Sequence, residues 1–101
     1  MLNVNFEAMD KEIGRLIASL APEQRENTVF IFLGDNGTPR QVAQTPYAQG
    51  RTKSTLFQGG INTPLIFSGK NITRTSVVET ALAQAPDMFA TIADLAGVGI
   101  S

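Results

Sequence analysis

The sequence contains no histidine and no cysteine. Histidine is the commonest general acid or base and the commonest transition-metal ligand, so its absence leaves carboxylates, amides and lysines to carry any chemistry. The absence of cysteine excludes disulfides, zinc thiolate sites and cysteine nucleophiles, and it leaves the redox compartment undetermined. Any site in this chain must therefore be built from oxygen ligands and basic side chains.

The sequence also has no charge excess, no long apolar run and no leader pattern. Eight Lys and Arg stand against nine Asp and Glu, for a net charge of −1. This balance gives no electrostatic basis for binding nucleic acid or an anionic membrane. No stretch approaches the ~20 apolar residues of a transmembrane helix, and the start lacks the regions of a signal peptide. We expect no nucleic-acid partner and no membrane partner, and the compartment is unknown.

The length and the apolar spacing indicate one small α/β unit over residues 1–101. With 101 residues and 43% hydrophobic content, such a unit is only marginally stable. Apolar residues at intervals of three and four predict a helix over 6–20, with Asn5 as N-cap, followed by a polar connection over 22–27. A second apolar face over 88–96 predicts another helix, with Gly97 at its C′ position. Asp87 is either the N-cap of that helix or a site residue.

The stretch from Thr28 to Gly37 is the most informative part of the sequence. Five of its first six residues are apolar without alternation, which predicts a strand buried on both faces within a parallel sheet. Asp35 and Asn36 follow directly on a glycine-flanked turn, at the carboxyl end of the strand, where ligands bind in open α/β sheets. Their oxygens suit a hard divalent cation such as Ca²⁺ or Mg²⁺. The alternative is that Asn36 and Gly37 form the turn of a β-hairpin.

A long irregular loop over 38–55 follows, and it is either functional or disordered. After it, Gly59 and Gly60 indicate a turn or bulge, and Pro64 opens a second short buried strand over 65–67. Between Ser68 and Pro86 the residues favour neither helix nor strand consistently. Lys53, at the end of the loop, would by itself be read as a solvated surface charge.

Two motifs together resemble the sulfatase family of the alkaline-phosphatase-like superfamily. They are VFIFLGDNG over 29–37 and KSTLFQGGINTPLI over 53–66, and the similarity extends to the predicted helices on either side. The resemblance implies a C-terminal part of a sulfatase catalytic domain. It also implies that Asp35 and Asn36 are ligands of a divalent cation, usually calcium, and that Lys53 binds a sulfate oxygen. A cation and an ammonium group together can neutralise the charge that develops on a transferring sulfuryl group.

Some positions depart from the family pattern. Gln58 stands where the family usually has Glu, Asn62 and Thr63 stand where Arg and Val are usual, and Ala85 and Pro86 precede Asp87 where a histidine is common. These departures indicate a divergent subgroup, for which phosphate esters are an alternative to sulfate esters. No serine lies in the Cys/Ser-x-Pro-x-Arg motif that supplies the family's nucleophile.

The resulting expectation is part of a sulfatase-like hydrolase of sulfuric or phosphoric esters, inactive as this chain alone and binding its cation weakly. The alternative is a non-catalytic α/β interaction module. Because strands of a larger sheet would leave unpaired edges and apolar faces, we also expect a homo-oligomer formed through those edges.

Overall fold

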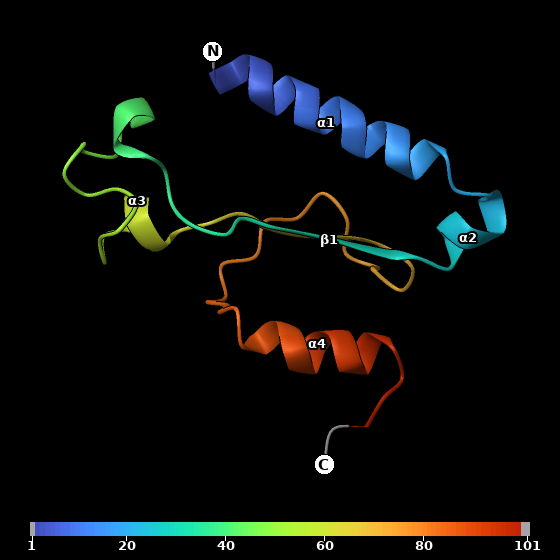
Figure 1. Cartoon of the computed structure of the whole chain (residues 1–101). Coiled ribbons are helices and arrows are strands. Elements are labelled where there is room, and N and C mark those ends of the chain that lie inside the picture. Colours follow the sequence, from blue (N-terminus) through green and yellow to red (C-terminus); the bar gives the residue numbers. More distant parts are fainter. Residues whose placement is uncertain (1, 100–101) are drawn as a thin grey trace.

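The computed structural model describes residues 2–99 as short helices around one pair of strands (Figure 1). No helix in this range is long and apolar enough to cross a membrane. In chain order the elements are α1 (Leu2–Ala18), α2 (Pro22–Glu26), β1 (Val29–Leu33), the 3₁₀ helix η1 (Arg40–Val42), α3 (Gln58–Ile61), β2 (Leu65–Gly69) and α4 (Asp87–Leu95).

Both predicted strands are present, and they pair with each other. β1 and β2 form a two-stranded antiparallel sheet, with Val29 opposite Gly69 and Leu33 opposite Leu65. The α/β class is confirmed, but the expectation of parallel strands buried on both faces is wrong, since every residue of β1 and β2 is exposed or half-buried. A continuous apolar run does not encode the direction of the neighbouring strand, and it does not by itself supply the elements that would cover both faces.

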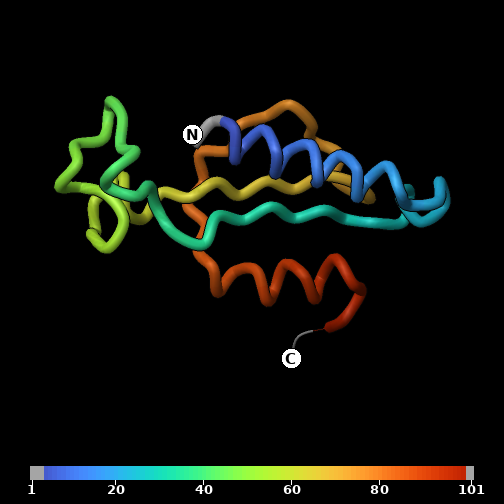
Figure 2. Tube along the Cα trace, turned by 45° about the horizontal axis from the view of Figure 1, so that its top comes forward, coloured from blue at the N-terminus to red at the C-terminus, as the bar shows by residue number. Residues whose placement is uncertain are grey.

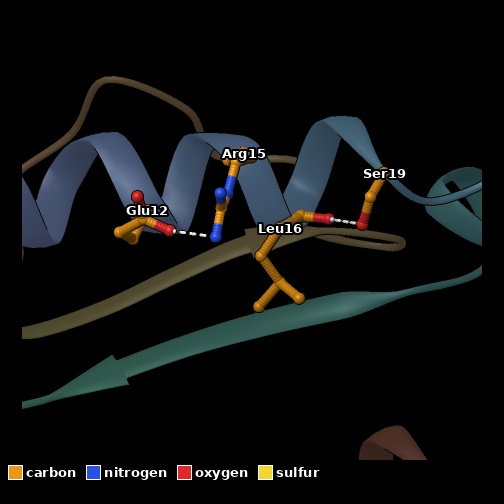
Figure 3. Close-up of polar contacts among 4 residues, drawn as sticks. All are labelled: Glu12, Arg15, Leu16 and Ser19. Atoms are coloured by element: carbon orange, nitrogen blue, oxygen red, sulfur yellow. Dashed lines mark hydrogen bonds and ion pairs between the residues drawn. The ribbon is translucent and has the colours of Figure 1, made fainter.

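The first helix is confirmed, but its ends differ from the prediction. α1 begins at Leu2, so Asn5 lies inside the helix and is not its N-cap, and the helix ends at Ala18. After the last turn, the hydroxyl of Ser19 donates to the carbonyl of Leu16 at 2.7 Å (Figure 3). Within the helix, the guanidinium of Arg15 pairs with the carboxylate of Glu12 at 2.6 Å. Pro22 begins α2 where a polar connection was expected, because proline is well suited to the first position of a helix.

The last helix ends as its sequence predicts. Gly97 is at C′ with φ of +72°, and the N–H groups of Gly97 and Val98 donate to the carbonyls of Asp94 and Ala93, which is a Schellman motif. Its start differs, because Pro86 is the N-cap and Asp87 is the first helical residue. The Asp87 carboxylate instead accepts a hydrogen bond of 2.7 Å from the N–H of Gln84.

The described residues contain no buried hydrophobic core. α1 and α4 flank the strand pair from opposite sides in both views, without closing over it (Figures 1 and 2). The accessible surface is 8554 Å², where a compact protein of 10.8 kDa exposes about 5,500 Å². The radius of gyration is 16.3 Å, compared with about 13 Å for a compact domain of this length. The fold is therefore open, with apolar faces on both the helices and the sheet.

Candidate functional site

The polar turn lies directly after β1, as predicted. Asp35 and Asn36 are exposed, and Gly37 is buried. The amide nitrogen Nδ2 of Asn36 donates to the carbonyl of Gly37 at 3.2 Å, which leaves Oδ1 as the amide atom suited to a cation. The chain does not return as a second strand after this turn, since the 3₁₀ helix η1 follows, so the hairpin alternative is wrong. An Asn-Gly pair favours a hairpin only where the next residues can form the partner strand.

Backbone hydrogen bonds join this turn to the two segments that carry Lys53 and the paired glycines. The N–H of Gly37 donates to Gly60 at 3.1 Å, and the N–H of Thr38 donates to Gly59 at 2.9 Å. The N–H of Lys53 donates to the carbonyl of Thr38 at 2.9 Å. We call these five residues the glycine junction. It brings all three predicted site residues to one end of the strand pair, where the loop lies in Figure 2.

The glycines of the junction are required by close backbone approach. A Cβ on Gly37 would lie 2.3 Å from the carbonyl oxygen of Gly59, and a Cβ on Gly60 would lie 2.1 Å from that of Thr55. Gly59 and Gly60 belong to the short helix α3, so their prediction as a turn or bulge is wrong. Gly59 and Gly60 contact Thr38 and Gly37, which lie far away in sequence. This contact explains the helical conformation of the two glycines better than the local preference of glycine for turns does.

The most buried residues lie at this junction. Within residues 4–99, only Gly37, Thr52 and Gly59 are buried. Thr52 is 2% exposed, and its hydroxyl donates to the carbonyl of Gln49 at 3.1 Å. The tightest packing of the chain is therefore at the candidate site. Thr52 was missed by sequence reasoning, because a threonine inside an irregular loop carries no periodic signal of burial.

The loop over 38–55 is irregular, as predicted, but it is built from successive turns. The N–H of Tyr47 donates to Gln44, that of Arg51 to Ala48 and that of Thr55 to Thr52, at 2.9 to 3.1 Å. Each turn satisfies backbone groups that a structureless loop would leave to water. The segment between β2 and α4 forms neither helix nor strand, which agrees with its mixed propensities.

The structure does not complete a metal site. Among residues 2–99 there is no group of three or more His, Cys, Asp or Glu residues that could hold an ion. Asp87 heads α4 and is bonded to Gln84, so it does not join the junction. The side chains of Asp35 and Asn36 carry only a minority of the ~6 to 8 oxygen ligands that calcium takes.

The structure thus brings an exposed carboxylate, an amide and the backbone of a lysine to one end of the strand pair in an α/β chain. Comparison with known proteins gives the family. The sulfatase family model matches residues 5–98, and the chain belongs to this family of hydrolases.

Its curated relatives agree with this assignment. The chain is 33% identical to a sulfatase of Formosa agariphila, over 90% of this chain and 18% of that protein. It is 27% identical to arylsulfatase G of Mus musculus, over 99% of this chain and 22% of that protein. The chain therefore spans about a fifth of the length of the curated relatives it matches. No solved structure matches it significantly.

Proposed function

We propose that this chain contributes part of the cation and substrate-anion site of a sulfatase-like hydrolase acting on sulfuric or phosphoric esters. The observation that supports this proposal most directly is the glycine junction, because it is non-local. Three backbone segments, at residues 37–38, 53 and 59–60, meet there through hydrogen bonds of 2.9 to 3.1 Å, and the only buried residues of the range 4–99 belong to the junction or directly precede Lys53 in sequence. Such a frame holds functional side chains at fixed positions although the rest of the chain is open.

In this proposal Asp35 and Asn36 are ligands of a divalent cation, with Ca²⁺ as the expected ion. The carboxylate supplies negative charge, and the amide presents Oδ1 because its nitrogen is bonded to Gly37. When bound, a divalent cation supplies positive charge that stabilises the negative charge developing on a transferring sulfuryl or phosphoryl group. Since the described residues contain no group of three or more His, Cys, Asp or Glu that could hold an ion, we expect binding by this chain alone to be weak, roughly millimolar at best.

Lys53 is the proposed anion-binding residue. Its backbone is anchored to Thr38 at 2.9 Å, while its side chain is exposed and free to reach a ligand. An ammonium group binds a sulfate or phosphate oxygen as a compact charge with three donors. The backbone of Lys53 is bonded to Thr38, three residues after Asp35, which supports the proposal that a cation and the ammonium group contact the same anion.

Titration with CaCl₂, followed by ¹H–¹⁵N NMR, tests the cation site. We expect the amide signals of Asp35, Asn36 and Gly37 to shift, with saturation in roughly the millimolar range. Asp35→Asn should remove the response, whereas Asp10→Asn, which changes an exposed carboxylate on α1, should not. The assignment of Asp35 as a cation ligand would be contradicted if Ca²⁺ shifted the amide signals equally in the two variants. Micromolar binding would contradict a site with only two protein ligands.

Titration with sodium sulfate tests Lys53 separately. We expect Lys53→Gln to remove the shifts near the junction. Lys70→Gln is the matched control, because Lys70 follows β2 and its ammonium group donates to Oδ1 of Asn27, outside the junction. Loss of the sulfate response in the Lys70 variant alone would exclude the proposed role of Lys53.

A further inference from the structure

Asn36 and Gly37 form the only Asn-Gly pair of the sequence, which we call the labile pair. Asparagine is a thermolabile residue, and it is most labile before glycine, because a backbone nitrogen with no Cβ beside it can easily attack the side-chain amide. Each of the other asparagines is followed by a residue that is aromatic or branched at Cβ and shields its backbone nitrogen: Val4, Phe6, Thr28, Thr63 and Ile72. The labile pair therefore lies in the turn that carries the candidate ligands.

The fold requires the glycine of the labile pair. A Cβ on Gly37 would lie 2.3 Å from the carbonyl oxygen of Gly59 and 2.5 Å from the carbonyl carbon of Gly60. Both contacts are with backbone, so no change of side-chain rotamer relieves them. A bulkier residue at this position would separate the segments of the glycine junction, and the labile pair is thus a consequence of their close approach.

Deamidation of the labile pair begins at the backbone nitrogen of Gly37. This nitrogen loses its proton to a base in solvent and forms a bond to Cγ of Asn36. The bond from Cγ to Nδ2 breaks at the same carbon, and Nδ2 takes up a proton and leaves as ammonia. Water then opens the cyclic imide at either carbonyl, which gives an aspartyl or an isoaspartyl residue. The net reaction consumes water, releases ammonia and adds a negative charge to the turn.

The glycine junction blocks the first step of this reaction. The N–H of Gly37 donates to the carbonyl of Gly60 at 3.1 Å, so the proton that must be removed is held in a hydrogen bond. Gly37 is also buried, which keeps a base in solvent away from its nitrogen, although Asn36 itself is exposed. The leaving group is restrained as well, because Nδ2 of Asn36 donates to the carbonyl of Gly37 at 3.2 Å. Nucleophile and leaving group are both engaged while the junction is closed.

We propose that Asn36 is a site of spontaneous deamidation, at which the reaction occurs only while the glycine junction is open. Two hydrogen bonds, from Gly37 to Gly60 and from Thr38 to Gly59, hold the Gly37 nitrogen in place. At the usual strength of such bonds, the closed chain should react about 30-fold more slowly than the unfolded chain. Local opening, and not the exposure of Asn36, then sets the rate. The inference is independent of the proposed function, since no cation or substrate anion takes part.

Mass spectrometry of the whole chain, incubated at mildly alkaline pH, tests the proposal. Samples are digested at intervals, and the modified fraction at position 36 is compared between native buffer and guanidinium chloride. We expect Asn36 to react about 30-fold faster in the denaturant, where both junction bonds are absent. Equal rates in the two conditions, or no reaction of Asn36 in the denaturant, would overturn the proposal.

Gly60→Ala opens the junction without changing the labile pair. An added Cβ would lie 2.1 Å from the carbonyl oxygen of Thr55, so position 60 must move away from its place as acceptor for Gly37. We expect deamidation of Asn36 in native buffer to approach the rate of the denatured chain. Gly50→Ala is the matched control, because Gly50 is exposed and an added Cβ would meet no atom within 4 Å. Equal deamidation rates in the two variants would contradict control by the junction.

Amide hydrogen exchange of the same samples separates local opening from global unfolding. If the ladder of β1 and β2 stays protected in Gly60→Ala while exchange at Thr38 and deamidation accelerate by the same factor, junction opening controls the reaction. If this variant also loses protection of the ladder, the parent chain in low concentrations of denaturant decides. Its deamidation rate should rise in proportion to exchange at Thr38. A deamidation rate that stays constant while exchange at Thr38 rises would exclude the proposal.

Discussion

Replacing Gly37 with alanine tests whether the glycine junction holds the candidate site together. Gly37 is buried, and its φ is not in the left-handed region, so alanine is acceptable to the backbone itself. The cost comes from contact, because the added Cβ would lie 2.3 Å from the Gly59 oxygen and 2.5 Å from the carbonyl carbon of Gly60. Both atoms belong to the backbone, so the segments that carry Gly37 and the paired glycines must move apart.

The separation should break the hydrogen bonds from Gly37 to Gly60 and from Thr38 to Gly59. Each such bond contributes about 1 kcal/mol net, so we expect the free energy of local opening to fall by about 2 kcal/mol or more. Amide hydrogen exchange at Thr38 and Lys53 should then accelerate at least ~30-fold. Exchange within the β1 and β2 ladder should change much less, because its bonds do not pass through the junction.

Gly50→Ala is the matched control for this experiment. Gly50 lies in the same loop, is exposed, and has no atom within 4 Å of an added Cβ. We expect this variant to exchange like the unmodified chain at Thr38 and Lys53. If the amides of Thr38 and Lys53 exchanged equally slowly in the Gly37 and Gly50 variants, the conclusion that close glycine contact sets the geometry of the site would be refuted.

Two further outcomes follow from the open fold and the site composition. The chain exposes about 3,000 Å² more surface than a compact protein of its mass, comparable to an obligate interface, so we predict a homodimer in sedimentation at micromolar concentration. Ile31→Lys removes an exposed apolar side chain from β1 and should shift the dimer to monomer, whereas Ser68→Lys replaces a side chain of β2 that is already polar and should not. A monomeric parent chain with a cooperative melt would contradict this prediction. We also predict that this chain has no measurable turnover of an aryl sulfate or aryl phosphate, because it contains no cysteine and none of its serines lies in the nucleophile motif. Hydrolysis that disappears in both Asp35→Ala and Lys53→Ala would disprove it.

Much of the local structure could be predicted because it depends on neighbours in sequence. The spacing of apolar residues located α1 and α4, and the continuous apolar runs located β1 and β2. Gly97 was placed correctly at C′, since a left-handed residue after a helix is favourable almost only for glycine. The exceptions were helix starts, where Asn5 and Asp87 had suitable side chains for a cap but the helical turns began elsewhere.

The sequence names candidate site residues, whose roles stay a prediction, whereas the backbone contacts around them are seen only in the structure. Asp35, Asn36 and Lys53 were identified from the motifs, and the chain does belong to the sulfatase family. Their proximity follows from hydrogen bonds that join Gly37 and Thr38 to residues 53, 59 and 60. Bonds between backbone groups leave no trace in side-chain type, except for the glycines that the close approach requires.

By itself, the sequence determined where α1, α4, β1 and β2 form, where the polar turn falls and which chemistry the side chains can support. Only the tertiary structure decided the antiparallel pairing of β1 with β2, the helical placement of Gly59 and Gly60, and the burial of Thr52. The physical reason is the range of the interactions: propensity and periodicity act over one or two turns of chain, whereas pairing and burial depend on which distant backbone segments meet.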